Sequence, residues 1–407
     1  MMFIAMLFAL LIENATTHCA TTNVTVTAAT TDKQLVGCGS DFPDNVLWNL
    51  DLADGISDGI ATRATRGRGA VVYVVDTGVD AAHDEMRRND GSSRVIAGLD
   101  ATVEMSTGAR SGACAQDSAT SPCFQGDDIL VYTHGTAVAS VIAGRTAGVA
   151  PDASIVAVRT QANGVRWPSG TTDLDIFIRC LDDIVKHAFD PSTPAFRTAV
   201  VNMSNIPSVT APGSTPRWAE FEGKLRMMIG GVDVNFNPDP NGKRFLFVVL
   251  AGNNNFTNPN KSLKGHCLLN NDAAYYPPAL GSSIDGLITV GGIDRQNNFW
   301  SGSCGGSAVD ILAPAESILV ASISAHDHYR GTSGGVDYTS GTSYAAPYVA
   351  GIAARMLESD PTLTPVQIEQ RIKDTAGFIF TPGAPAGGRV AILNERPAPP
   401  HRRAAAH

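Results

Sequence analysis

Three short motifs in this chain carry residue types that together can cut an acyl bond. Asp76-Thr-Gly78 follows an apolar run, His134-Gly-Thr136 opens a run rich in alanine and valine, and Gly341-Thr-Ser343 opens a further apolar run. A serine hydroxyl is a poor nucleophile until an imidazole takes its proton, and the imidazolium then needs a nearby anion. Each residue alone has an ordinary structural explanation, a turn for the aspartate and a helix cap for the other two. Together they predict nucleophilic catalysis.

The serine motif also offers a place for negative charge. Residues 343–357 are apolar on almost every face, which predicts a buried helix beginning at Ser343. The free backbone N–H groups and the positive dipole end at that start favour an oxyanion. Ala251-Gly-Asn253 places a fourth polar residue at the end of another apolar run.

Apolar runs alternate with helical patterns through most of the chain. The runs are typical of strands covered on both faces and lie at 70–75, 154–158, 199–203, 245–250 and 287–290. Helical patterns lie between them at 134–144, 174–188 and 218–229, and beyond them at 366–376. This alternation predicts an α/β fold in three layers, with a mainly parallel central sheet flanked by helices. Ligands bind at the carboxyl ends of such strands, where Asp76 and Asn253 both fall.

Four segments are predicted along the 407 residues. The apolar run at 3–12 is too short to span a bilayer but fits the core of a signal peptide, which assigns residues 1–20 to a signal. Residues 21–43 are rich in threonine and alanine and are expected to be a flexible leader. The catalytic domain then covers 44–396, and 397–407 is expected to be a disordered tail. A signal peptide implies secretion or, alternatively, residence in the endomembrane lumen.

The composition bears on the kinds of partner. Hydrophobic residues make up 43% of the chain and charged residues 17%, which suits a large folded domain. The 30 basic and 39 acidic residues give a net charge of -9 without a dense basic cluster, so neither nucleic acid nor stable membrane insertion is expected. The seven cysteines form no CxxC pair, which argues against zinc. Loss of Cys19 with a signal leaves an even number, suited to an oxidising compartment.

The motifs, in the order Asp76, His134 and Ser343, resemble those of the subtilisin-like serine protease (subtilase) family, nearest its proteinase K branch. The resemblance covers about residues 44–380 and includes Gly148-Val-Ala-Pro151. It implies a subtilisin-like fold and a secreted, monomeric serine endopeptidase. Such an enzyme hydrolyses peptide bonds in proteins or peptides through an acyl-enzyme intermediate and needs no cofactor for catalysis.

In that family each site residue has a defined role, which the resemblance transfers to this chain. Ser343 is implied as the nucleophile, His134 as general base and then acid, and Asp76 as the carboxylate that holds the imidazole tautomer. Asn253 matches the side-chain donor to the oxyanion, and the Ser343 backbone N–H is the second donor.

The segment that lines the substrate cleft in relatives departs from the family here. Relatives usually continue from the serine equivalent to Ser204 with Leu-Gly-Gly, whereas this chain has Asn205-Ile-Pro207. Ser204, Asn205 and Gly252 are predicted to bind substrate. Pro207 has no N–H to donate, so no substrate preference is transferred. Tyr344 follows the nucleophile where a methionine is common.

The resemblance also implies a structural calcium ion. Asp310 matches the aspartate that holds calcium in the proteinase K branch, with a carbonyl near Pro277 or Pro278 as a co-ligand. A loop-capping role explains Asp310 equally well. Glu85 matches a calcium ligand of subtilisin itself, but the loop that completes that site is missing from 144–148.

The cysteines leave the disulfide connectivity partly open. The resemblance implies a bridge between Cys267 and Cys304, and a bridge between Cys114 and Cys123 is expected to close a loop in a polar insertion. Cys180 lies in a helical pattern, where a buried free thiol is nearly as good an explanation as a third bridge.

Two other functions remain open from the sequence. Gly331-Thr-Ser333-Gly-Gly335 fits the nucleophile elbow of an α/β-hydrolase, which would make the protein an esterase using Ser333. That elbow follows an apolar strand, however, and residues 325–330 are polar. The other alternative is a catalytically inactive subtilase-fold protein that binds peptides. The altered 205–207 segment favours it, and the intact motif residues oppose it.

Overall fold

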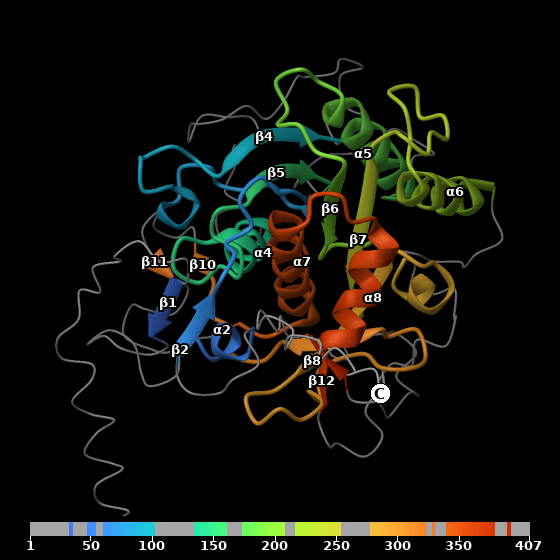
Figure 1. The fold of residues 1–407 in the computed structure, drawn as a ribbon. Coiled ribbons are helices and arrows are strands. Elements are labelled where there is room, and N and C mark those ends of the chain that lie inside the picture. Colours follow the sequence, from blue (N-terminus) through green and yellow to red (C-terminus); the bar gives the residue numbers. More distant parts are fainter. Residues whose placement is uncertain are drawn as a thin grey trace, which may run out of the picture.

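The structure, a computed structural model, describes residues 32–35, 47–53, 60–101, 134–160, 173–207, 216–253, 277–322, 328–329, 339–378 and 389–391 (Figure 1). In these residues a large sheet lies between helices, which is the α/β architecture predicted from the sequence. Across the same residues, no helix is both long enough and apolar enough to cross a membrane.

A nine-stranded sheet forms the centre of the fold. From one edge to the other its strands are β12 (Gly377–Phe378), β13 (Arg389–Val390), β9 (Ile311–Pro314), β8 (Leu287–Ile293), β7 (Arg244–Leu250), β6 (Thr198–Met203), β3 (Val71–Asp76), β5 (Ser154–Arg159) and β4 (Val95–Asp100). Neighbouring strands pair in parallel, except β12 with β13. Strands β3, β6 and β8 are buried at every position, because helices cover both faces of the sheet. The predicted mainly parallel sheet is confirmed.

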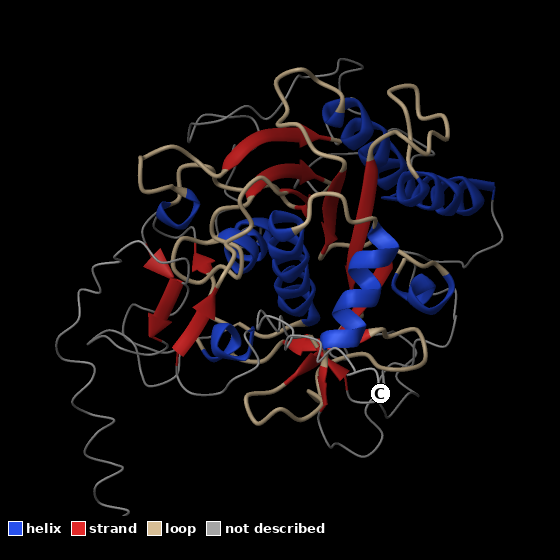
Figure 2. Ribbon diagram, in the orientation of Figure 1, coloured by secondary structure: helices blue, strands red, loops and turns tan. Residues whose placement is uncertain are grey.

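Helices form the two outer layers (Figure 2). Helices α4 (His134–Ala143) and α7 (Thr342–Ser359) pack together on one face, and α5 (Asp173–Ala188) and α6 (Pro216–Gly230) pack together on the other. Helix α8 (Pro365–Thr375) begins behind a capping box formed by Thr364 and Gln367. All five helices lie within two residues of the predicted bounds.

Helix α7 runs through the core and carries Ser343 at its start. Its residues from Thr342 to Leu357 are all buried, as the apolar pattern predicts. Pro347 lies close to the first turn, where a missing N–H matters least. A Cβ at Gly351 would lie only 2.6 Å from the Cβ of Val149. A larger residue at that position would push α7 away from the segment that follows α4.

A carboxylate near the end of α7 ties this helix to the segment that leads into β3. Glu358 Oε2 accepts the backbone N–H groups of Arg66 at 2.6 Å, Gly67 at 2.6 Å and Arg68 at 3.0 Å. Hydrogen bonds to a charged acceptor are stronger than neutral ones. We call this arrangement, made by Glu358 and residues 66–68, the Glu358 clamp.

Short elements surround this core. Strand β1 (Asp32–Leu35) pairs antiparallel with β2 (Ile60–Arg63), and β10 (Ala321–Ser322) pairs antiparallel with β11 (His328–Tyr329). Strand β1 falls inside 21–43, where a flexible leader was expected, because its backbone finds partners on β2. Helix α2 (Trp48–Ala53) buries Trp48 and Leu50, which anchors the chain before β2. The described residues also include the 3-10 helices η1 (Asp84–Met86) and η3 (Pro278–Ser283).

Candidate active site

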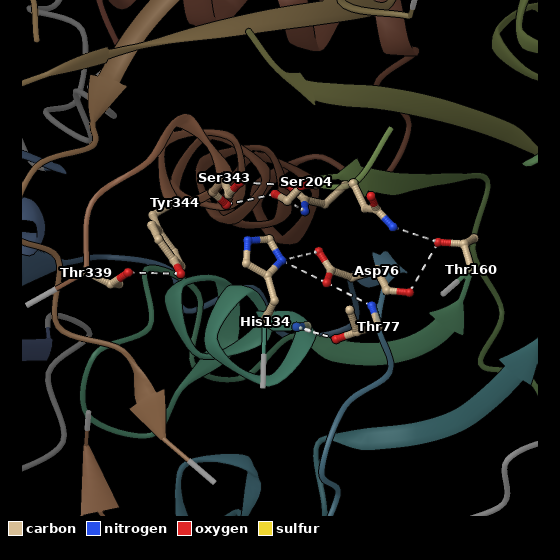
Figure 3. Close-up of polar contacts among 11 residues, drawn as sticks. Asp76, Thr77, His134, Thr160, Ser204, Thr339, Ser343 and Tyr344 are labelled. Atoms are coloured by element: carbon tan, nitrogen blue, oxygen red, sulfur yellow. Dashed lines mark hydrogen bonds and ion pairs between the residues drawn. The ribbon is translucent and has the colours of Figure 1, made fainter. Parts of the chain in front are cut away.

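The aspartate predicted in the site ends β3 and is fully buried. Its Oδ1 accepts the N–H of Thr77 at 2.8 Å, and its backbone carbonyl accepts the N–H of Thr160 at 2.8 Å. Both carboxylate oxygens lie within hydrogen-bond distance of His134 Nδ1, at 2.9 and 3.0 Å (Figure 3). Asp76 is therefore held by backbone groups and directed at the imidazole.

His134 opens α4 beside this carboxylate. The N–H of Gly135 donates to Thr77 Oγ1 at 3.0 Å, and a Cβ on Gly135 would lie 2.1 Å from the carbonyl oxygen of Gly78. Only glycine fits there. An ionised carboxylate can only accept hydrogen bonds, so Asp76 places the imidazole proton on Nδ1 and leaves Nε2 as an acceptor. The His134 side chain is 32% exposed, so a substrate can reach it.

Ser343 lies in the first turn of α7. Its backbone carbonyl accepts the hydroxyl of Ser204 at 2.8 Å, and the Ser204 oxygen accepts Asn202 Nδ2 at 3.0 Å. The Ser343 hydroxyl is 3.5 Å from the Ser204 carbonyl oxygen. Figure 3 shows the His134 ring between Asp76 and Ser343. The structure thus brings the three predicted residues together at the carboxyl ends of the strands.

The fourth predicted residue, Asn253, faces the start of α7 from the segment after β7. Its Oδ1 accepts both the N–H of Thr342 at 2.8 Å and the Thr342 hydroxyl at 3.0 Å. A backbone N–H can only donate, so the amide oxygen must point at Thr342 and the Nδ2 group must point the other way. Nδ2 then lies beside Gly341, where a Cβ would be 3.3 Å from it. A donor at this place can meet the oxygen of a carbonyl that Ser343 attacks.

The residues predicted to bind substrate make contacts within the protein. The Ser204 hydroxyl is on the Ser343 carbonyl, as described above, and Asn205 Nδ2 donates to Thr160 Oγ1 at 3.1 Å. Gly252 adopts a φ of 98°, in the left-handed region that favours glycine, and its carbonyl accepts the N–H of Cys304 at 2.9 Å. Their part in substrate binding stays a prediction.

The aspartate predicted to hold calcium is engaged by an internal cation. Asp310 Oδ1 accepts the Lys373 ammonium at 2.8 Å, and Oδ2 accepts the N–H of Thr289 at 2.8 Å. The same ammonium donates to Glu369, whose other oxygen accepts the N–H of Gly286. Among the described residues, no group of three or more His, Cys, Asp and Glu can hold a metal ion. The Lys373 ammonium supplies a positive charge beside Asp310 in the described structure.

The other oxygens expected to bind calcium also have partners within the protein. The carbonyl of Pro278, one of the two expected co-ligands, accepts the Thr289 hydroxyl at 2.7 Å. For the second site, Glu85 Oε2 accepts the N–H groups of Thr146 at 2.9 Å and Ala147 at 3.3 Å. Protein donors thus occupy these oxygens, and calcium at Asp310 stays an untested prediction.

Replacing Lys373 with methionine is expected to destabilise the fold. Burial raises the pKa of Asp310 and of Glu369, and Lys373 opposes both shifts. Burial alone would lower the pKa of Lys373, but the two carboxylates outweigh it and raise this pKa. Breaking a buried ion pair costs roughly 3–5 kcal/mol, and the 25% exposure of the Lys373 side chain places this case at the lower end. Thermal melting at neutral pH measures the loss.

The pH dependence of that loss follows from the direction of the carboxyl shifts. A group whose pKa is raised in the folded state favours folding below its unfolded pKa, about 4, and loses that contribution as pH rises. The Lys373→Met loss should therefore shrink in acid, where Asp310 and Glu369 are protonated. Arg371→Gln, on the same helix as Lys373, is the control, because it removes an exposed contact with Asp360 and should cost about 0–1 kcal/mol. Stabilisation of the wild-type chain by calcium that Asp310→Asn abolishes would contradict this view.

The cysteine predictions are tested only in part. Cys304 is disulfide-bonded and Cys180 is a buried free thiol. Burial raises the pKa of the Cys180 thiol, with the nearby Asp183 and Asp182 acting in the same direction. Cys267, Cys114 and Cys123 lie outside the described residues, so their pairings stay predictions.

The alternative nucleophile Ser333 also lies outside the described residues. Before it, β11 is a two-residue strand paired antiparallel with β10, apart from the large sheet. A nucleophile elbow requires a core strand leading into a helix. The described structure gives no support to an α/β-hydrolase site there.

Sequence reasoning missed three residues that support the site: Thr77, Thr342 and Asn202. Thr77 directly follows Asp76, and Thr342 directly precedes Ser343, so their places inside the motifs are the available signal. Asn202 is fully buried in β6, and a polar residue in an otherwise apolar run is the signal for it.

Known proteins resemble this chain over most of its length. The profile of the Subtilase family matches residues 67–396. A cuticle-degrading serine protease from Arthrobotrys oligospora is 30% identical over 76% of this chain and 57% of its own length. An extracellular serine proteinase from Thermus sp. is 30% identical over 79% of this chain and 59% of its own length. This chain therefore spans less than two thirds of either relative.

A solved structure shows the same fold. The crystal structure of a cold adapted subtilisin-like serine proteinase matches with a TM-score of 0.54 and 24% identity, over 85% of this chain and 97% of that one. At this identity the likeness concerns the fold alone. The family profile, by contrast, covers most of the chain, motifs included. The chain belongs to the Subtilase family.

Proposed function

We propose that this protein is a secreted serine endopeptidase that hydrolyses peptide bonds with Asp76, His134 and Ser343. The observation that carries the proposal is the contact between His134 Nδ1 and both oxygens of Asp76, at 2.9 and 3.0 Å, beside the start of α7. This contact favours the tautomer in which Nε2 can accept a proton. Membership of the Subtilase family and relatives named as serine proteases support the same function.

The first step of the reaction forms a tetrahedral intermediate. The Ser343 oxygen attacks the carbonyl carbon of the scissile peptide bond while its proton passes to His134 Nε2. Asp76 offsets the positive charge of the imidazolium. The carbonyl oxygen becomes an oxyanion and accepts hydrogen bonds from Asn253 Nδ2 and the Ser343 N–H.

The later steps release the amine and then the acid. His134 gives its proton to the leaving amine nitrogen, the carbon–nitrogen bond breaks, and the acyl group remains on Ser343. Water then attacks the ester carbon and loses a proton to His134. Collapse of this intermediate frees the acid and returns the proton to the Ser343 oxygen, so the residues end as they began.

Secretion is the proposed location. The apolar run at 3–12 has the length of a signal-peptide core, although it lies outside the described residues. A relative from Thermus sp. is named as extracellular. The disulfide at Cys304 suits an oxidising compartment. Protein and peptide substrates, and a monomeric state, complete the proposal.

Two measurements on the purified full chain test this function. Digestion of a mixed peptide library should yield internal cleavage products, and a fluorophosphonate probe should attach to Ser343. Intact peptides and no labelling would support the inactive peptide-binding alternative. Labelling at Ser333 instead would support the esterase alternative.

A further inference from the structure

The residue after the nucleophile lies against the catalytic imidazole. The ring centroids of Tyr344 and His134 are 5.8 Å apart, with 49° between the ring planes. Figure 3 shows Tyr344 on one side of His134 and Asp76 on the other. Tyr344 is 5% exposed, so its ring offers little surface to a substrate. Its contact with His134 concerns the imidazole itself.

A hydrogen bond fixes the far end of the Tyr344 ring. The hydroxyl of Thr339 donates to the Tyr344 oxygen at 3.1 Å. Thr339 is itself paired with Ile318 by two backbone hydrogen bonds, at 2.8 and 3.3 Å. At its near end, Tyr344 is part of α7, and its N–H donates to the carbonyl of Gly341 at 3.0 Å. The ring is thus held both at its backbone and at its hydroxyl.

Asp76 contacts the imidazole at Nδ1, at 2.9 and 3.0 Å. A tilt of the ring about that edge would move Nε2 away from the Ser343 oxygen. An aromatic ring against the imidazole limits this tilt. The Tyr344 ring also attracts the imidazole more strongly once the imidazole is charged, because an aromatic ring stabilises a cation within about 6 Å of its centroid.

We propose that Tyr344, tethered by Thr339, is a positioning residue that keeps His134 Nε2 directed at Ser343 during proton transfer. The inference rests on the function proposed above. The proton leaves the Ser343 oxygen, resides on Nε2 and then passes to the leaving nitrogen, and Tyr344 takes no part in this transfer. Its contribution is larger in the transition state, where the imidazole carries charge, than in the substrate complex.

Three variants test this role by steady-state kinetics. Tyr344→Leu removes the ring and should lower kcat by about 3- to 15-fold, with KM within about twofold of wild type. Tyr344→Phe keeps the ring but removes its tether and should lower kcat by about 2- to 5-fold. Thr339→Val removes the same tether from the other side and should match Tyr344→Phe. The double variant of these two should be no slower than either alone, since both remove one interaction.

A control separates positioning from a general loss of packing. Phe221→Leu truncates an equally buried aromatic residue, which packs on Trp218 in α6 and does not touch His134. It should lower the melting temperature and leave kcat unchanged. An equal fall in kcat for Phe221→Leu and Tyr344→Leu would overturn the proposal. So would a Tyr344→Leu effect confined to KM, or additive losses in the double variant.

Fluorophosphonate labelling distinguishes this inference from the proposed function. If the wild-type chain neither cleaves peptides nor takes the label at Ser343, the proposed function fails and the Tyr344 role fails with it. If the wild type is active but Tyr344→Leu and Thr339→Val both keep its kcat, only the role of Tyr344 fails. If Tyr344→Leu does not fold, Thr339→Val and Tyr344→Phe still decide the question.

Discussion

Replacing Ser343 with alanine is expected to lower kcat for peptide hydrolysis by about 10⁶. The fold should survive, because the hydrogen bond that the hydroxyl makes among the described residues is a long one, 3.5 Å to the Ser204 carbonyl oxygen. His134→Ala should cause a loss of similar size. The double variant should be no worse than either single one, because the two residues act as a unit. A fluorogenic peptide assay, with circular dichroism to check the fold, measures both effects.

Two other serines provide matched controls. Ser340→Ala changes an exposed serine whose oxygen accepts the N–H of Ser317, and it should keep activity. Ser333→Ala should also keep activity, and a loss there would instead favour the esterase alternative. Ser343→Ala with more than about a hundredth of wild-type turnover would contradict the assignment of the nucleophile.

Asn253→Asp is expected to lower kcat by roughly 10²–10³ with little change in KM. The aspartate has nearly the same shape and still accepts the two hydrogen bonds that Asn253 takes from Thr342. What it lacks is the Nδ2 donor, and its charge repels an oxyanion. The variant therefore removes oxyanion stabilisation but keeps the helix cap, that is, the hydrogen bonds from Thr342 at the start of α7. Asn253→Ala would remove both.

The comparison of the two Asn253 variants has a further use. If the cap matters for stability, Asn253→Ala should melt at a lower temperature than Asn253→Asp, while both are similarly slow. Asn298→Asp, at an exposed asparagine bound to Asp294, is the control and should have ordinary activity. An Asn253→Asp effect that appears only in KM would rule out an oxyanion role.

The sequence predicted the long helical patterns and the long apolar runs. Strand β3 and helix α7 are examples of such runs, because burial on all sides demands apolar residues at most positions. Strand β4 was missed, since a glycine interrupts it and four of its six positions are only partly buried at the sheet edge. Strands β12 and β13 have two residues each and leave no readable pattern.

The sequence likewise predicted some residues of the site and not others. Asp76, His134 and Ser343 each lie in a short motif of consecutive residues, so the sequence alone could predict them as site residues. Lys373 could not, because it lies 63 positions from Asp310 and only the fold brings its ammonium there. The sequence shows that Tyr344 stands where a methionine is common in relatives. It does not predict the ring contact with His134, because no local pattern indicates one.

The Glu358 clamp has a consequence for how the site comes apart. Helix α7 carries Ser343 at one end and Glu358 near the other, and β3 runs from the clamp to Asp76. The helix and the strand are thus joined at the clamp and meet again at the site, through His134. Fraying at the clamp leaves the other end closed, so it does not separate Ser343 from His134 and Asp76. In native-state hydrogen exchange, the amides of α7 and β3 are expected to lose protection in one cooperative step. Glu358→Gln should lower the free energy of that opening.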